Sequence, residues 1–157
     1  MGGAAATLAP GSSGTGEVLI KAVRLKDGHG QERAEFRNGE TLRVEVEFET
    51  RQPLDSPVMG VALFRDDGVY CYGPNTLFDG QLAGRYDGRY VLTAEFMDLP
   101  LLGGDYQASV AFYDKDHVYA YAWNHRLYPF SVRSDRPDHG LVWLRHRFDV
   151  RKIGEGR

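Results

Sequence analysis

The sequence predicts an all-β protein, built as an antiparallel sandwich or barrel. Apolar residues recur with a period of two from Glu17 onward, which is typical of strands with one buried and one solvent-facing side. Turn signals such as Asn38-Gly39 and Gly103-Gly104 separate the apolar runs at short intervals. No segment keeps a helical period beyond a turn or two. Many short strands with tight connections are therefore expected.

The first residues differ in composition from the rest of the chain. Residues 1–16 are mainly Gly, Ala, Ser and Thr without periodicity, so we expect a disordered leader or linker there. This stretch lacks the Gly-Lys-Ser/Thr of a phosphate-binding loop, and no strand precedes it, so no ATP site is expected. The sandwich itself is predicted over residues 17–148, and a flexible tail over residues 149–157.

The clearest strand is the segment Thr41–Thr50. Its apolar residues alternate with Arg and Glu, and they are Leu42, Val44, Val46 and Phe48. This alternation places one side of the strand in the core and the other in water. Further strands are expected over residues 17–26, 57–65, 69–73, 89–97, 105–113, 118–123, 127–133 and 141–147.

An apolar corner precedes the strand expected at residues 105–113. The segment Leu99–Gly104 ends one strand and turns the chain, and Tyr106 opens the next. This order resembles the tyrosine corner of immunoglobulin-like sandwiches, in which the tyrosine hydroxyl bonds back to the corner backbone. We therefore expect an immunoglobulin-like antiparallel β-sandwich and a structural role for Tyr106.

Charge and cysteine content exclude several functions. The chain has 19 Lys and Arg against 22 Asp and Glu, a formal net charge of -3, so neither nucleic acid nor an anionic membrane is expected as a partner. Cys71 is the single cysteine, which excludes an internal disulfide and favours a reducing compartment. No apolar run reaches the roughly 20 residues of a membrane span.

Metal and cofactor sites are not expected. The five histidines lack zinc-ligand spacing. Asp114 and Asp116 could ligate calcium, but the rest of a calcium loop is missing, and the segment is more typical of a hairpin turn.

Alternating aromatic residues suggest a binding surface. Tyr119, Tyr121 and Trp123 are separated by alanines, and Tyr70 and Tyr72 repeat the pattern. In a regular strand each set would point to one face. The rings could fill the core. Alternatively they form a platform for sugars, whose C–H faces pack on flat rings while neighbouring polar side chains bind the hydroxyls.

Polar side chains accompany these rings. Gln107, Ser109, Ala111 and Tyr113 alternate with the expected core residues of their strand, so their face is small and polar. This face could hold a ligand or be an ordinary solvated sheet surface. Further polar candidates beside the rings are Asn75, Asp79, Asp114, Asp116, His117, Asn124, His125 and Arg126.

Catalytic signals are weak. No serine has a Gly-x-Ser-x-Gly context. Cys71 with His125 could form a nucleophile pair only by spatial coincidence, and Cys71 is expected in the core. A carbohydrate-active enzyme could use Asp79, Asp114 or Asp116. Asp79 and Asp114 could act as a glycosidase pair, but the sequence does not define their separation. We expect no catalytic residues and therefore no enzyme.

Several segments together resemble a known family. They are Gly14–Glu17, Tyr72–Thr76, Leu99–Tyr106, His125–Val132 and Gly140–Val142 followed by His146. They are similar to the C-terminal domain of Wzt-type proteins, the ATPase subunits of ABC transporters that export O-antigen and related polysaccharides in bacteria. The resemblance implies an immunoglobulin-like sandwich that binds the exported glycan, a homodimer that exchanges its C-terminal strand, and a cytoplasmic location beside the ATPase and membrane subunits.

These observations predict a non-catalytic module that binds a bacterial polysaccharide for export. The expected glycan-binding residues are Tyr70, Tyr72, Asn75, Tyr113, Tyr119, Tyr121, Trp123, His125 and Arg126. For the last two, plainer roles remain open: Arg126 could pair with a surface carboxylate, and His125 could bond a loop carbonyl. The alternative functions are an immunoglobulin-like interaction or dimerisation domain, whose interface would contain the aromatic residues, and a carbohydrate-active enzyme.

Overall fold

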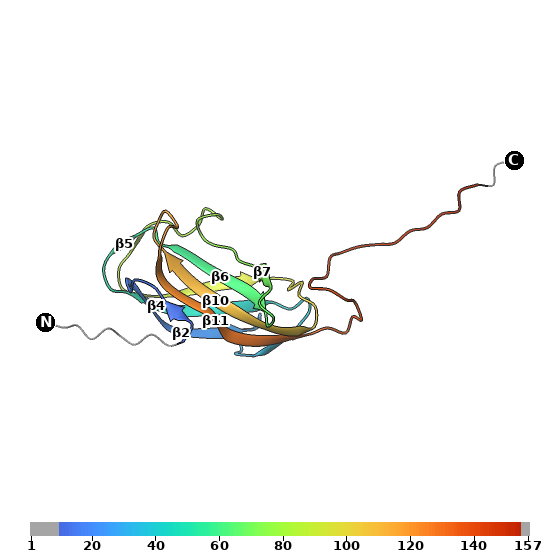
Figure 1. Ribbon diagram of the computed structural model, residues 1–157, viewed down its shortest axis with the longest axis horizontal. Helices are drawn as coiled ribbons and strands as arrows, with labels where there is room; N and C mark the ends of the chain where they lie inside the picture. Colours follow the sequence, from blue (N-terminus) through green and yellow to red (C-terminus); the bar gives the residue numbers. More distant parts are fainter. Residues whose placement is uncertain (1–9, 155–157) are drawn as a thin grey trace.

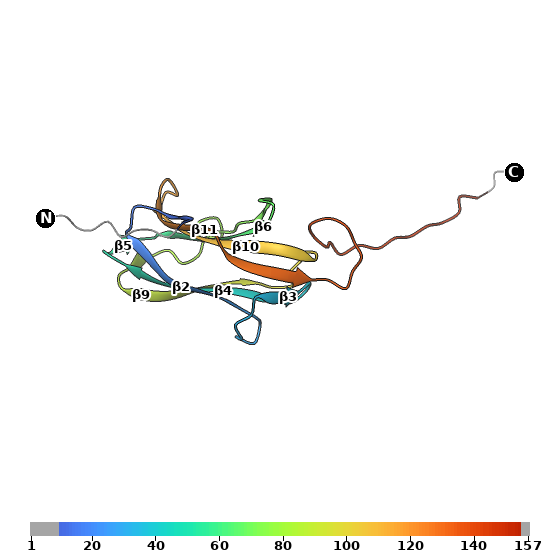
Figure 2. The same ribbon diagram turned by 60° about the horizontal axis from the view of Figure 1, so that its bottom comes forward.

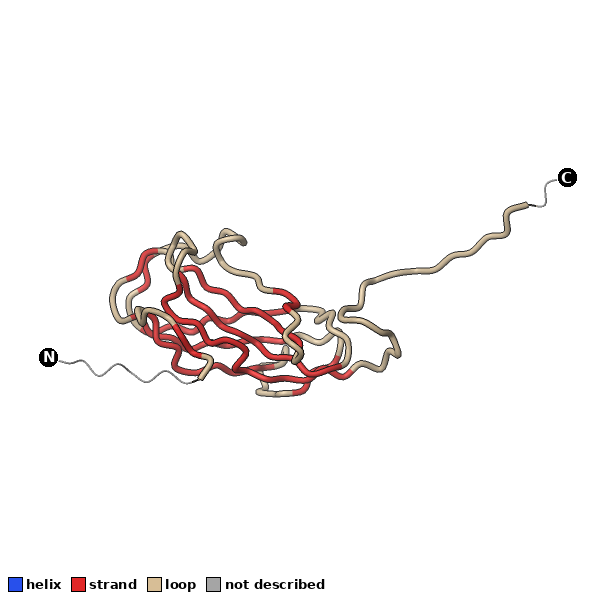
Figure 3. Tube along the Cα trace, viewed as in Figure 1, coloured by secondary structure: helices blue, strands red, loops and turns tan. Residues whose placement is uncertain are grey.

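The structure, a computed structural model that describes residues 10–154, consists of two facing β-sheets (Figures 1 and 2). The larger sheet has the strand order β1-β11-β10-β6-β7, and β3 pairs in parallel with the end of β11. Its strands are β1 (Ser12–Ser13), β3 (Glu35–Arg37), β6 (Val58–Arg65), β7 (Tyr70–Tyr72), β10 (Gly104–Tyr113) and β11 (Ala120–Arg133). The described residues contain no helix (Figure 3). They consequently contain no helical segment that could span a membrane.

The opposing sheet has three strands in the order β2-β4-β9. They are β2 (Val18–Lys26), β4 (Leu42–Thr50) and β9 (Arg89–Phe96). Along the chain, β5 (Leu54–Asp55) follows β4 and β8 (Arg85–Tyr86) precedes β9, and these two short strands pair with each other. All pairs are antiparallel except β3 with β11. The prediction of an all-β antiparallel sandwich is confirmed.

The core lies between the two sheets. Every second residue of β4 is buried, as the alternation predicts, and so is every second residue of β10 from Tyr106 to Phe112. The rings of Phe48 and Phe112 meet across the sheets with centroids 4.5 Å apart. Burying a side chain of this size stabilises the fold by roughly 1.5–3 kcal/mol. The opposite face of β10 is consequently free for other contacts.

The tyrosine corner is present. The Tyr106 hydroxyl donates a hydrogen bond of 2.6 Å to the Leu102 carbonyl, four residues upstream. Burial raises the pKa of Tyr106 to about 12. This contact confirms both the immunoglobulin-like class and the structural role of Tyr106.

Two strand predictions are wrong. Residues 118–123 and 127–133 belong to a single strand, β11, which contains an irregular stretch where the break was expected. Residues 141–147 form no strand, and only Val142 pairs, with Leu101. The prediction fails there because an alternating sequence becomes a strand only where it has a neighbour to pair with.

The segment Gly11–Gly16, predicted as the end of a disordered leader, lies along the edge of β11. Ser12 and Ser13 pair with Asn124 and Trp123, and the Gly16 amide donates to the Tyr121 carbonyl at 2.9 Å. Gly14 (φ +122°) passes so close to β11 that a Cβ atom there would lie 2.6 Å from the Tyr121 carbonyl oxygen. The rest of the predicted leader, residues 1–9, lies outside the described residues.

The C-terminal segment leaves the sandwich. After Trp143, whose amide donates to Pro100, the chain extends away from both sheets (Figure 1). Phe148 and Val150 are 90% and 95% exposed. The apolar side chains of this segment are therefore exposed and do not pack in the core.

Candidate functional site

A recess of about 240 Å³ lies on the outer face of the larger sheet. Its floor consists of small residues at paired positions, because Gly60 and Ala62 of β6 lie opposite Ala111 and Ser109 of β10. The next residues along each strand point into the core. The recess therefore follows from small side chains at neighbouring outward positions of two central strands.

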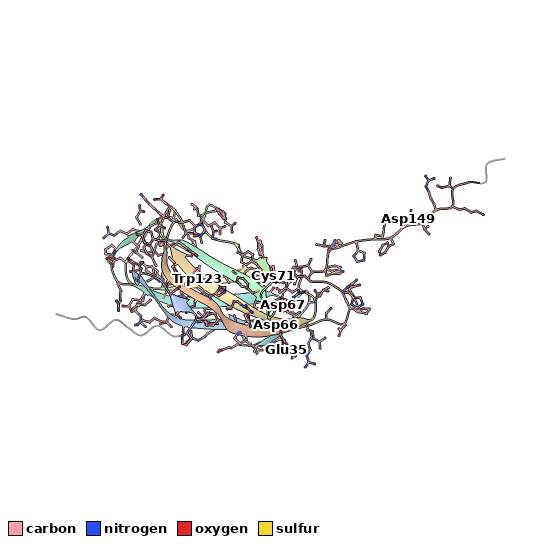
Figure 4. The ribbon with its side chains drawn as sticks, viewed as in Figure 1. Glu35, Asp66, Asp67, Cys71, Trp123 and Asp149 are labelled. Carbon is pink, nitrogen blue, oxygen red and sulfur yellow. The ribbon has the colours of Figure 1, made fainter. Side chains whose placement is uncertain are left out.

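Aromatic rings form the walls of this recess. Phe64 of β6 contacts both the Tyr70 ring, at 4.9 Å between centroids, and the His125 ring, at 5.1 Å. His125 in turn lies 4.9 Å from Trp123. The residues that line the recess and carry rings or polar groups are Phe64, Tyr70, Asn75, Ser109, Tyr113, His117 and Trp123. Figure 4 shows Trp123 over the larger sheet.

Four of the nine predicted site residues thus line the recess: Tyr70, Asn75, Tyr113 and Trp123. His125 and Arg126 adjoin it through Phe64, since the Arg126 Cζ atom lies 6.0 Å from the centre of the Phe64 ring. Of the floor residues, Ser109 and Ala111 belong to the small polar face on which a ligand was considered, whereas Gly60, Ala62 and the wall residue Phe64 were not predicted. The sequence did contain a signal for the positions on β6. Val61 and Leu63 are apolar core candidates, and the alternation of a strand then places residues 60, 62 and 64 on the outer face.

Tyr119 and Tyr121 do not share a face with Trp123. Phe112 of β10 pairs with Ala122 of β11, but the next residue, Tyr113, pairs with Ala120. Tyr121 therefore has no partner on β10 and forms a bulge. Tyr121 joins the core, where burial raises its pKa to about 12, and Tyr119 packs on its ring at 5.6 Å. The prediction that the three rings point to one face is wrong, because this bulge reverses the alternation.

A second irregularity separates Tyr70 from Tyr72. Tyr72 pairs with Leu63 and Tyr70 with Phe64, so three residues of β7 oppose two of β6. Tyr72 consequently contacts Phe96 of β9, at 6.4 Å between ring centroids, on the side away from the recess. Cys71 is half-buried against the core, and burial raises the pKa of its thiol.

The residues His125–Leu127 bulge out of β11 opposite Ser109. Arg126 has a left-handed backbone, with φ +55°, a conformation that costs a non-glycine residue roughly 1–2 kcal/mol. Its amide donates to the buried Ser109 hydroxyl at 2.7 Å. Bulges and strained residues of this kind concentrate at functional sites.

The Arg126 side chain lies across the sheet. Its Nε donates to the Gln107 side-chain oxygen at 2.6 Å, and its Nη2 donates to the Asp66 carbonyl at 2.8 Å. Neither acceptor is a carboxylate, so the alternative of a surface ion pair is not what the structure shows. The His125 Nδ1 is buried without a hydrogen-bond partner among the described residues.

Two of the acidic residues considered for catalysis, Asp114 and Asp79, lie at different places in the fold. The Asp114 carboxylate accepts the Tyr119 amide at 2.9 Å and the Val118 amide at 2.7 Å, and these bonds lower its pKa. It thereby closes the turn before β11. Asp79 lines a different depression, together with Leu82 and Thr93. Over residues 10–154, no group of three or more His, Cys, Asp or Glu side chains could hold a metal ion.

Comparison with solved structures identifies the fold. The crystal structure of the C-terminal domain of Wzt superposes with a TM-score of 0.79 at 16% identity, over 88% of this chain and 87% of that one. An immunoglobulin-like protein from Pseudomonas aeruginosa aligns with a TM-score of 0.41 at 13% identity, over 77% of this chain and 100% of that one. A β-glucosidase from Listeria innocua in complex with glucose aligns with a TM-score of 0.42 at 12% identity, over 74% of this chain but only 16% of the β-glucosidase chain.

Sequence comparison gives the family. No curated protein sequence matches the chain. The sequence model of the Wzt C-terminal domain, however, matches residues 11–144. This span runs from the edge segment before β1 to the point where the chain leaves the sandwich. Together with the structural match, it shows that the chain belongs to the Wzt C-terminal domain family.

Proposed function

We propose that this domain is a non-catalytic carbohydrate-binding module that recognises a bacterial polysaccharide of the O-antigen type for export by an ABC transporter. The observation that carries the proposal is the recess with its small-residue floor and ring walls. A pyranose has a C–H face that packs on an aromatic ring and a rim of hydroxyl groups that need hydrogen bonds. The recess offers both kinds of contact.

The rings and polar groups have distinct parts in this proposal. Trp123 and Tyr70 stand on the two sides of Phe64 and His125 and would pack on the sugar. Asn75 and His117 would bind its hydroxyls. The volume lies below the roughly 300–1,000 Å³ typical of small-molecule pockets, so we infer that one sugar residue or chain end is held at a time.

The family supports the cellular setting of the proposal. A Wzt-type domain implies association with the ATPase and membrane subunits of a transporter, and hence a cytoplasmic location at the inner membrane. The proposal gives this chain the task of selecting the polysaccharide, while ATP hydrolysis and translocation belong to those partners.

We further propose a homodimer formed by exchange of the C-terminal segment. Residues 144–150 alternate apolar or aromatic side chains with Arg and Asp, as a strand with one buried face does. A groove of about 370 Å³ lies where this segment leaves the sandwich, lined by Tyr72, Phe96, Met97, Leu101 and Val142. β9 beside it has β4 as its neighbour and an open second edge in the described part. In this proposal the C-terminal segment of a second copy would pair with this edge, and two recesses in one dimer would strengthen polymer binding by avidity.

The experiment is a glycan array with the purified chain and two matched variants. Tyr70 and Tyr72 are both 59% exposed and lie two residues apart on opposite sides of the sheet. With short monovalent glycans, which occupy one recess and gain nothing from a dimer, we expect Tyr70→Ala to reduce binding about tenfold, as loss of a stacked ring does, and Tyr72→Ala, in the dimer groove, to leave it unchanged. Trp123→Ala should behave like Tyr70→Ala.

Equal behaviour of the two tyrosine variants would contradict the site. Absence of binding to every glycan, including polysaccharide of the source organism, would instead favour the interaction-domain alternative.

A further inference from the structure

Arg126 differs from the other half-buried arginines in its partners. Among the described residues, those arginines are Arg24, Arg33, Arg43, Arg65 and Arg126. The first four have a carboxylate oxygen at 3.9, 3.4, 3.6 and 2.8 Å respectively. Arg126 forms no ion pair in the described part of the chain and is held by two neutral oxygen acceptors. No carboxylate of the described residues therefore lies at ion-pair distance from this guanidinium.

The guanidinium also keeps donors free. It has five N–H groups, and its two side-chain hydrogen bonds use one on Nε and one on Nη2. Nη1 lies beside Gly68, which has no side chain to cover it. Because the neighbouring acceptors already fix the orientation of the group, an anion that binds the free N–H groups would need little further ordering.

The recess beside Arg126 contains no opposing charge. None of its lining residues is Asp or Glu. In the adjoining turns, Asp67 is bound by Arg65, and Asp114 is bound by two backbone amides. The remaining carboxylates of these turns, on Asp66 and Asp116, belong to exposed residues, where water screens them.

We propose that the site selects glycans with an anionic group. Arg126 lies outside the recess, across the Phe64 ring that forms its wall, and its guanidinium binds the carboxylate or phosphate oxygens of a group that extends from the sugar in the recess past this ring. This inference rests on the proposed function, because it names the class of glycan for the same recess. Ring packing on Trp123 and Tyr70 positions the sugar, and the charge-assisted hydrogen bonds to Arg126 discriminate against neutral sugars.

The experiment compares chemically matched polysaccharides. Acidic bacterial polysaccharides are arrayed in native, carboxyl-reduced and dephosphorylated forms beside neutral ones. We expect binding to fall about tenfold or more after one of these treatments, since a charge-assisted bond contributes at least that factor. Loss after reduction identifies a carboxylate, and loss after dephosphorylation identifies a phosphate.

Variants assign the effect to Arg126. Arg126→Gln should remove the preference for the acidic form, and Arg126→Lys should retain part of it. Arg51→Gln is the matched control, because Arg51 is exposed and has no ion pair in the described region, so the same charge is lost elsewhere. The native protein alone provides a second measurement: its binding to the acidic form should weaken as NaCl rises from 50 to 500 mM.

The outcomes separate the two proposals. Binding of native and reduced polysaccharides with equal affinity, still dependent on Trp123, overturns the anionic preference and leaves the glycan-binding function intact. An unchanged preference in Arg126→Gln overturns the assignment to that residue. Absence of binding to any form overturns both.

Discussion

At the scale of single residues, the same residue type serves different purposes in this sandwich. The Tyr106 hydroxyl ties the corner to Leu102, Tyr121 fills the core, and Tyr70 faces the recess. The hydrogen-bond partner and the strand register decide between these roles, so residue type alone does not identify a binding residue.

Tyr106→Phe should destabilise the domain. The change removes the donor and leaves the Leu102 carbonyl buried without it, which costs roughly 1–3 kcal/mol. Urea unfolding measures the difference. Tyr72→Phe is the control, because no hydrogen bond of its hydroxyl is present in residues 10–154, and its effect should stay within about 0.5 kcal/mol. A Tyr106→Phe protein as stable as the native one would show that the hydrogen bond from Tyr106 to Leu102 does not stabilise the domain.

The sequence predicted the core residues better than the site residues for a physical reason. Alternation assigns Leu42 and Val110 to the core because their strands are regular. Bulges depend on how two strands pair, and neither strand alone shows them. The positions of Tyr72 and Tyr121 and the left-handed backbone of Arg126 all arise from such register shifts.

At the scale of elements, β1 is the least expected part of the sheet. A glycine- and serine-rich segment normally stays flexible because it buries little apolar surface. Here glycine is an advantage, since Gly14 lets the backbone approach β11 more closely than any side chain would permit. The segment covers the edge of the strand that carries Trp123 and His125.

Gly14→Ala should detach this segment from β11. The new Cβ atom would lie 2.6 Å from the Tyr121 carbonyl oxygen, whereas at Gly16 nothing lies within 4 Å. Both glycines have positive φ, +122° and +94°, so Gly16→Ala controls for backbone strain. Hydrogen exchange at the Thr15 and His125 amides, which bond to Ala120 and Gly11, should accelerate in Gly14→Ala far more than in Gly16→Ala. Equal rates in both variants would show that the close approach is unimportant.

At the scale of the whole molecule, the sandwich and the C-terminal segment are of opposite character. The sandwich buries its apolar residues between two sheets, whereas the segment after Trp143 exposes Leu144, Phe148 and Val150. The sandwich was predictable from sequence because its contacts are internal. For the C-terminal segment the sequence predicted a strand over residues 141–147 that the sandwich does not contain, because only Val142 finds a partner there.

Ending the chain after Trp143 should convert the proposed dimer to a monomer. The described part of the removed segment belongs to no strand of the sandwich, so the circular dichroism spectrum should keep its β character. Light scattering coupled to size exclusion gives the mass. Phe148→Asp in the full chain should weaken association in the same direction without shortening it. A truncated protein that remains dimeric would exclude exchange of this segment.

The paired small residues of the recess floor also have a kinetic consequence. Gly60 with Ala111 and Ala62 with Ser109 are rungs of the continuous ladder between β6 and β10. The floor can therefore change shape only if inter-strand hydrogen bonds break. A ligand that packs on this floor would therefore not wait for the sheet to rearrange before it binds. In the proposed function, this preformed floor would let the site bind successive polysaccharide chains without a change in the sheet.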